Sequence, residues 1–176
     1  ILFRPSVINE SNLRLYFPLG EEAGATSVYD WGSNGLIGTI YGSSGRIPGR
    51  VGSGILFDGS SNTHIKIRNH RAMRMPSKGQ YTGNIWVRTD VATTTYAGAF
   101  TRNSRNYSLY LGDTNVANGA NAQHRFRMGT NTNVGVNNAN RVAPSTWTMV
   151  TITNEGNGGV ARTYLNGGLM QSKPMT

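Results

Sequence analysis

The carboxylates of this chain are too scattered to supply the paired acids that cleave a glycosidic bond. That reaction needs two carboxyl groups beside one bond, and residues two apart on a strand would project them from the same face. Only Glu21 and Glu22 lie close together in the sequence, and as neighbours on a strand they would point to opposite faces. Acids distant in sequence could still meet in space, so a glycosidase or lyase stays a minor alternative to a protein that is not an enzyme. The eight acids are Glu10, Glu21, Glu22, Asp30, Asp58, Asp90, Asp113 and Glu155.

Other familiar catalytic patterns are missing from the sequence. His64, His70 and His124 lack the spacing of a zinc-binding helix, and the chain has no Cys. No Gly-x-Ser-x-Gly turn is present to expose a nucleophilic serine. The glycine-rich residues 49–54 are followed by a strand pattern where a phosphate-binding helix would have to begin. We therefore interpret this stretch as a turn into a buried strand.

Sugar recognition is a chemistry that the remaining residues could support. Exposed aromatic rings stack on sugar faces, while amide and guanidinium groups donate hydrogen bonds to hydroxyls. Two of the aromatic residues lie in or beside predicted turns, and residues 102–106 form a loop rich in donors. Each residue alone is more often plain surface, so only their number supports recognition. The candidate carbohydrate-binding residues are Trp31, Tyr41, Tyr96, Arg102, Asn103, Arg105 and Tyr110.

The chain is basic, with 17 Lys and Arg against 8 Asp and Glu and a formal charge of +9. Such a surface attracts phosphate without sequence-specific contacts, but no basic run typical of a nucleic-acid-binding arm is present. The densest cluster is more consistent with a solvated strand edge and loop than with a dedicated anion site. Its candidate polyanion-binding residues are Lys66, Arg68, Arg71 and Arg74.

The length of 176 residues predicts one domain with its own core. We expect residues 1–12 to be an N-terminal arm or edge segment and residues 13–176 to form the domain. No apolar run is long enough to span a membrane.

Apolar residues alternate with polar ones along much of the chain, which predicts half-buried antiparallel strands. The clearest examples are residues 13–19, 64–68, 107–111 and 125–128. Asn-Gly and Asp-Gly pairs supply turns, and Asn166-Gly167 most strongly predicts a hairpin. Residues 68–75 are the only place where a helical turn is expected. The Asn- and Gly-rich residues 115–140 are interpreted as one strand between two long loops.

Four segments, in this order, resemble the laminin-G-like branch of the concanavalin A-like jelly roll. The first segment resembles the family's opening strand, followed by a turn of acidic and glycine residues and a loop that contains Asp, Ser, Gly and Asn. The second is a glycine-spaced entry to Phe57-Asp58-Gly59, the third places Trp86 on a central strand, and the fourth joins a Trp147 strand to the Asn166-Gly167 hairpin. The segments cover residues 13–35, 49–67, 81–88 and 147–168.

This resemblance implies an all-β fold, an antiparallel two-sheet jelly-roll β-sandwich in which Trp86 and Trp147 fill the gap between the sheets. It also implies an optional structural calcium ion, with Asp30, Asn34 and Asp58 as the candidate ligands. An equally good interpretation is that Asp30 and Asp58 only bind turn backbone.

The family continues with further strands after its Asn-Gly hairpin, whereas this chain ends at Thr176 and begins without Met. We therefore expect a processed or partial chain. If the chain is complete, a sheet edge lies open, and we expect it to pack against other protein chains in an assembly or beside another domain.

Three functions remain open. The leading one is a non-catalytic recognition module that binds carbohydrate or a cell-surface polymer through loops of the sandwich. The second is a structural component, such as a virion decoration, capsid-surface or tail-fibre protein. The third is a binder of nucleic acid or another polyanion, which the charge distribution disfavours. The expected location is extracellular or on a virion surface.

Overall fold

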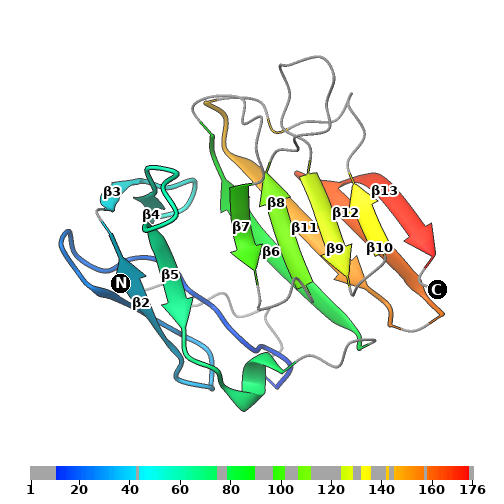
Figure 1. Cartoon of the computed structure of the whole chain (residues 1–176), viewed down its shortest axis with the longest axis horizontal. Helices are drawn as coiled ribbons and strands as arrows, with labels where there is room; N and C mark the ends of the chain where they lie inside the picture. Colours follow the sequence, from blue (N-terminus) through cyan, green and yellow to red (C-terminus); the bar gives the residue numbers. More distant parts are fainter. Residues whose placement is uncertain are drawn as a thin grey trace. The chain divides into compact units, whose positions relative to one another are not determined.

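The computed structural model describes residues 11–42, 44–74, 79–89, 97–101, 107–111, 124–128, 132–135, 142, 145–156 and 158–174. The chain divides into two compact units, Ile1–Arg74 and Met75–Thr176 (Figure 1). All the sheets are antiparallel, as the alternating sequence pattern predicts.

The first unit contains a three-stranded sheet, in the order β1-β2-β5, and a separate hairpin of β3 and β4. Inward side chains come from alternate positions: Val28 is fully buried, and Gly38 is buried between it and Ile65. The predicted helical turn is confirmed as a short 3-10 helix at Arg71–Met73. The strands are β1 Ser27–Tyr29, β2 Ile37–Tyr41, β3 Gly45–Pro48, β4 Ser53–Leu56 and β5 His64–Ile67.

Residues 13–19 form no strand, although their alternating pattern predicts one. Their backbone bonds to a loop instead: Tyr16 N donates to Asp30 Oδ1 at 2.8 Å, and Trp31 N donates to Tyr16 O at 2.9 Å. The amide of Asn34 donates to Leu13 O at 3.1 Å. Because two side chains and the backbone of Trp31 satisfy these groups, the segment needs no partner strand.

The second unit contains two four-stranded sheets, in the orders β13-β12-β11-β6 and β10-β9-β8-β7. They lie face to face in Figure 1, and Ala99 of β7 packs against a core of Val87, Val142, Val150 and Leu165. This arrangement confirms the predicted antiparallel sandwich. The strands are β6 Tyr81–Val87, β7 Ala97–Thr101, β8 Tyr107–Leu111, β9 His124–Met128, β10 Thr132–Gly135, β11 Thr148–Asn154, β12 Val160–Leu165 and β13 Gly168–Pro174.

The predicted hairpin is confirmed at Asn166-Gly167, where β12 ends and β13 begins. Both residues have positive φ, 49° and 84°, as a tight two-residue hairpin turn requires. The single strand expected within residues 115–140 is half right, because β9 pairs there with a second strand, β10. Asn and Gly, which make up half of β10, have low strand propensity, and pairing with β9 outweighs this local preference.

The prediction that Trp86 fills the gap between the sheets is wrong. The side chain of Trp86 is 37% exposed, while Val87 next to it is buried, so the indole projects from the outer face of β6. Trp147 is half-buried just before β11, with the guanidinium of Arg88 at 5.6 Å from its ring centroid. Among the described residues, valine and leucine side chains form the core cluster, and Trp86 is not part of it.

Replacing Thr163 by valine is expected to raise the free energy of unfolding by about 1 kcal/mol. Thr163 is 1% exposed and its hydroxyl has no hydrogen-bond partner among the described residues, so its desolvation is uncompensated. Valine has the same shape without the hydroxyl. Urea unfolding would measure the change. Thr82→Val, at an exposed strand position, is the control and should shift stability by no more than about 0.5 kcal/mol. Destabilisation by Thr163→Val would show that the hydroxyl is satisfied.

Candidate functional site

The outer face of the β13-β12-β11-β6 sheet is the most extensive patterned surface in the described part of the second unit. Burial alternates strictly along β6, β11 and β12, and the registers place the outward positions in rows across the sheet. We call this surface the Trp86 face. Its residues are Thr82, Asn84, Trp86, Met149, Thr151, Thr153, Arg162, Tyr164 and Leu169.

One end of the Trp86 face is the pair of Trp86 and Met149, which face each other across β6 and β11. Tyr164 and Leu169, which is 55% exposed, pair in the next row and extend it onto β12 and β13. The turn after β12 braces this end, because Asn166 N donates to Met149 O and Met149 N donates to Asn166 Oδ1, both at 2.9 Å. The indole therefore stands on a strand whose partner is bonded firmly to the hairpin.

Hydroxyl and amide side chains occupy the middle of the Trp86 face. Asn84 Nδ2 donates to Thr151 Oγ1 at 2.7 Å across the β6–β11 pair. Thr82 and Thr153 pair one row further along, where the hydroxyl oxygen of Thr153 is buried. Asn84, Thr151 and exposed Thr82 offer both donors and acceptors on the same face as the aromatic ring.

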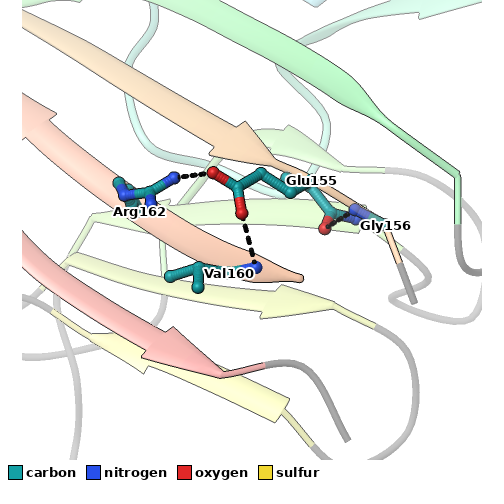
Figure 2. A network of polar contacts seen from close by, with 5 residues as sticks. Glu155, Gly156, Val160 and Arg162 are labelled. Carbon is teal, nitrogen blue, oxygen red and sulfur yellow. Dashed lines mark hydrogen bonds and ion pairs between the residues drawn. The ribbon is translucent and has the colours of Figure 1, made fainter. Parts of the chain in front are cut away.

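An ion pair closes the polar end of the face, as Figure 2 shows. The guanidinium of Arg162 donates to Glu155 Oε1, and the backbone N–H of Val160 donates to Glu155 Oε2 at 3.1 Å. These two bonds, from Arg162 first and then from Val160, lower the pKa of the Glu155 carboxyl, while the carboxylate raises the pKa of Arg162. The charges of the pair cancel locally, so this face carries little net field of its own.

Glu155→Gln is expected to lower the melting temperature at pH 7 but not in strong acid. A depressed folded-state pKa contributes stability above the ordinary value near 4.5, and this contribution is lost as pH falls through the lowered pKa. Melting curves of both proteins from pH 7 to pH 2.5 would show the difference shrink to zero. Glu22→Gln, at an exposed acid with no described side-chain partner, is the control. An equal gap between wild type and Glu155→Gln at every pH would contradict the ion pair's role.

Of the predicted sugar-binding residues, the side chains of Trp31 and Tyr41 are described, and each contacts a different ring. Trp31 is half-buried and meets Tyr16 edge-on, with ring centroids 6.5 Å apart. Tyr41 is 45% exposed and stacks on His64. Tyr110 lies in β8 opposite Gly98 and Arg125, and nothing is described of its side chain. Tyr96, Arg102, Asn103 and Arg105 lie outside the described residues.

The candidate calcium ligands are engaged with the protein itself. Asp30 Oδ1 accepts from Tyr16 N and from Gly32 N, and its Oδ2 accepts from Leu36 N at 3.4 Å. The amide nitrogen of Asn34 donates hydrogen bonds to Leu13 O and Arg14 O. Hydrogen bonds from Thr63 and then Ser60 lower the pKa of Asp58. No group of three His, Asp or Glu side chains that could hold a metal ion occurs among the described residues, and calcium binding stays a prediction.

The candidate polyanion-binding residues all lie in the first unit and are all exposed. Lys66 is on β5, Arg68 follows it, and Arg71 and Arg74 lie in and after the 3-10 helix. None of the helices in the described part of the chain has the length and apolar character to cross a membrane.

The residues of the Trp86 face were missed because a tryptophan on a strand was expected to be core. The period-2 pattern of residues 81–87 could have found it: Gly83, Ile85 and Val87 share one face, so Trp86 must share the other with Asn84.

The chain belongs to the concanavalin A-like lectin/glucanases superfamily, whose laminin-G-type family model matches residues 58–176. This match and the antiparallel sandwich confirm the class of protein that the four sequence segments resemble.

Two solved structures share the fold. The binding domain of Paraclostridial Mosquitocidal Protein 1 superposes with a TM-score of 0.71 at 15% identity, covering 94% of this chain. This chain spans only 41% of that domain's length. Domain 4 of AbnA, a GH43 extracellular arabinanase from Geobacillus stearothermophilus, in complex with arabinotriose, superposes with a TM-score of 0.59 at 20% identity, covering 88% of this chain and 77% of that one. No curated protein sequence matches the chain.

Proposed function

We propose that this chain is a non-catalytic carbohydrate-binding module, and that the Trp86 face binds a neutral oligosaccharide. The observation that carries the proposal is a large indole, 37% exposed, standing on a sheet beside a row of hydroxyl and amide groups. A partly exposed tryptophan costs free energy in water unless something covers it, and a sugar ring offers a flat C–H surface of matching size.

Each part of the face suits one part of a sugar. The indole of Trp86 and the side chain of Met149 receive the apolar face of a ring. Asn84 and Thr151 remain able to accept and donate hydrogen bonds, since their mutual bond uses one donor and one acceptor. Arg162 offers further N–H donors beyond the one given to Glu155.

Charge selects a neutral ligand at this face. Arg162, the only face residue with a formal charge, is paired with Glu155. An acidic sugar would meet the Glu155 carboxylate beside its guanidinium target and would gain little. A neutral sugar meets no such opposition.

The proposal includes binding without hydrolysis. Cleavage by the usual mechanisms needs two carboxyl groups flanking the bond, about 5 to 9.5 Å apart. Glu155 is the only acid of the second unit within the described residues, and it is occupied by Arg162 and Val160.

The structural neighbours support this function without defining the ligand. One of them holds arabinotriose and belongs to an extracellular enzyme, which supports carbohydrate binding outside the cell. The assembly partners, the virion surface and the calcium ion stay predictions from the sequence, since no finding favours them.

A titration of the protein with neutral oligosaccharides, beginning with arabinotriose, tests the proposal. We expect binding of at least one neutral member of a broad glycan panel, with a shift in tryptophan emission as the ligand covers Trp86. Trp86→Phe should keep much of the affinity. It should lose most of the emission shift, because the two remaining tryptophans, Trp31 and Trp147, are not residues of the Trp86 face. Absence of binding across the whole neutral panel by calorimetry would overturn the function.

A further inference from the structure

A second patterned surface lies on the outer face of the β1-β2-β5 sheet in the first unit. The registers Tyr29↔Ile37, Thr39↔Lys66 and Tyr41↔His64 place these six side chains on one side, opposite buried Val28 and Gly38. Tyr29, Ile37 and Tyr41 are 53%, 51% and 45% exposed. We call this surface the Tyr41 face.

An aromatic pair stands at one corner of the Tyr41 face. The rings of Tyr41 and His64 are stacked, with centroids 5.0 Å apart and planes 14° from parallel. Stacking on His64 orients the Tyr41 ring across the strands and leaves nearly half of the residue in water. The pair is therefore a preformed platform for a further flat group.

The positive charge beside this platform forms no ion pair with a described acid. Glu21 is taken up by Arg46 at 3.6 Å and by Tyr29 N at 2.9 Å, and Asp30 and Asp58 accept backbone N–H groups. Among the residues that the structure describes, no carboxylate pairs with Lys66 or Arg68. The Tyr41 face thus differs from the Trp86 face, where the guanidinium has its own carboxylate.

We propose that the Tyr41 face is a second carbohydrate site, and that it binds an acidic saccharide bearing a carboxylate. A sugar ring would stack on Tyr41 while its carboxylate meets the ammonium of Lys66. On a strand, residues two apart on the same face lie about 7 Å from each other. His64 and Lys66 have that spacing on β5, and His64 stacks on Tyr41. The aromatic pair and the ammonium group are therefore close enough to contact the same sugar unit. The site lies in the other compact unit and does not depend on the Trp86 face.

Affinity electrophoresis in gels containing polygalacturonate, alginate or hyaluronan tests this site, with fully methyl-esterified polygalacturonate as the uncharged control. We expect retardation in at least one acidic gel and much less in the esterified one. Tyr41→Ala is the decisive variant, because it leaves the charge unchanged and should weaken binding by about tenfold or more. Lys66→Gln should weaken binding by about threefold or more.

Controls separate a built site from attraction by the overall charge of +9. Arg14→Gln, at an exposed position of the same unit outside the face, removes the same charge as Lys66→Gln and should change retardation by less than about twofold. Equal effects of Arg14→Gln and Lys66→Gln, with none from Tyr41→Ala, would overturn the proposal. So would the absence of retardation in every acidic gel.

The same variants keep this proposal apart from the first one. Trp86→Ala should leave retardation by the acidic gel unchanged, and Tyr41→Ala should leave neutral-sugar binding unchanged. Loss of acidic binding in Trp86→Ala and not in Tyr41→Ala would place both ligands on the Trp86 face and overturn the second site alone.

Discussion

Replacement of Trp86 by alanine is expected to weaken neutral-oligosaccharide binding by about 30-fold or more, while the protein stays folded. Buried aromatic anchors at binding surfaces commonly contribute about 2 kcal/mol or more, which corresponds to this factor. The indole projects outward with 37% exposure, so its removal opens no cavity in the core of Val87, Val150 and Leu165. Calorimetry with the best neutral ligand measures the affinity, and a melting curve checks the fold.

Phe57→Ala is the matched control for this variant. Phe57 is an aromatic residue of similar exposure, 41%, and it lies in the other compact unit. Its removal should leave neutral-sugar affinity within about twofold of wild type, as expected for a residue outside the contact. Equal losses in Phe57→Ala and Trp86→Ala would mean that affinity follows general stability and not contact with the indole.

Replacement of Gly38 by alanine is expected to lower the free energy of unfolding by about 1 to 3 kcal/mol. A Cβ at this position would lie 2.6 Å from Cγ2 of Ile65 and 2.7 Å from Cγ2 of Val28. Both neighbours are β-branched and held on strands, so neither can rotate away at low cost. Urea unfolding, followed by the tryptophan emission, measures the loss.

Gly20→Ala provides the comparison for the Gly38 variant. A Cβ at Gly20 would meet nothing within 4 Å, and its φ is not in the left-handed region. That change should be neutral or stabilise the protein by about 0.4 to 1 kcal/mol, through the unfolded chain. If Gly38→Ala were equally harmless, the inner side of the β1-β2-β5 sheet would be packed more loosely than these distances indicate.

Local sequence rules predicted the fold where they act over short distances. Asn166-Gly167 adopts the positive φ values that its residue types favour, and the two strands beside it pair directly. The alternation of Ile65 and Ile67 with charged neighbours likewise predicted a strand, which the structure has as β5. Such features depend on neighbours in the chain, so composition and spacing are enough to find them.

A longer-range contact decided one element that was predicted wrongly. Residues 13–19 have the pattern of a strand, but the side chains of Asp30 and Asn34 bond to their backbone groups. These contacts come from a separate segment, which no local pattern reveals. The strand β10 was missed for a different reason: its Asn and Gly suggested a loop, yet it forms a hairpin with β9, which ends at Met128.

The two proposed faces use some of the residues named from the sequence, but in other combinations. Aromatic rings beside hydrogen-bond donors were expected on loops, whereas the described structure gathers them on sheet faces. Tyr41 and Lys66 were both named as candidates, yet for two different ligands, because only the register of β2 with β5 shows that they share a surface. Trp86 was assigned to the core by its size, and the burial of Ile85 and Val87 relative to it decides otherwise.

The rows of the Trp86 face run across four strands, which sets the length of the ligand it can hold. Neighbouring strands lie about 4.8 Å apart, so four of them measure about 14 Å from the first to the last. A chain of several sugar units laid across the strands would follow one row and contact every strand, from Asn84 on β6 to Leu169 on β13. Affinity should therefore climb as a ligand is lengthened one unit at a time and level off once its end passes the last strand.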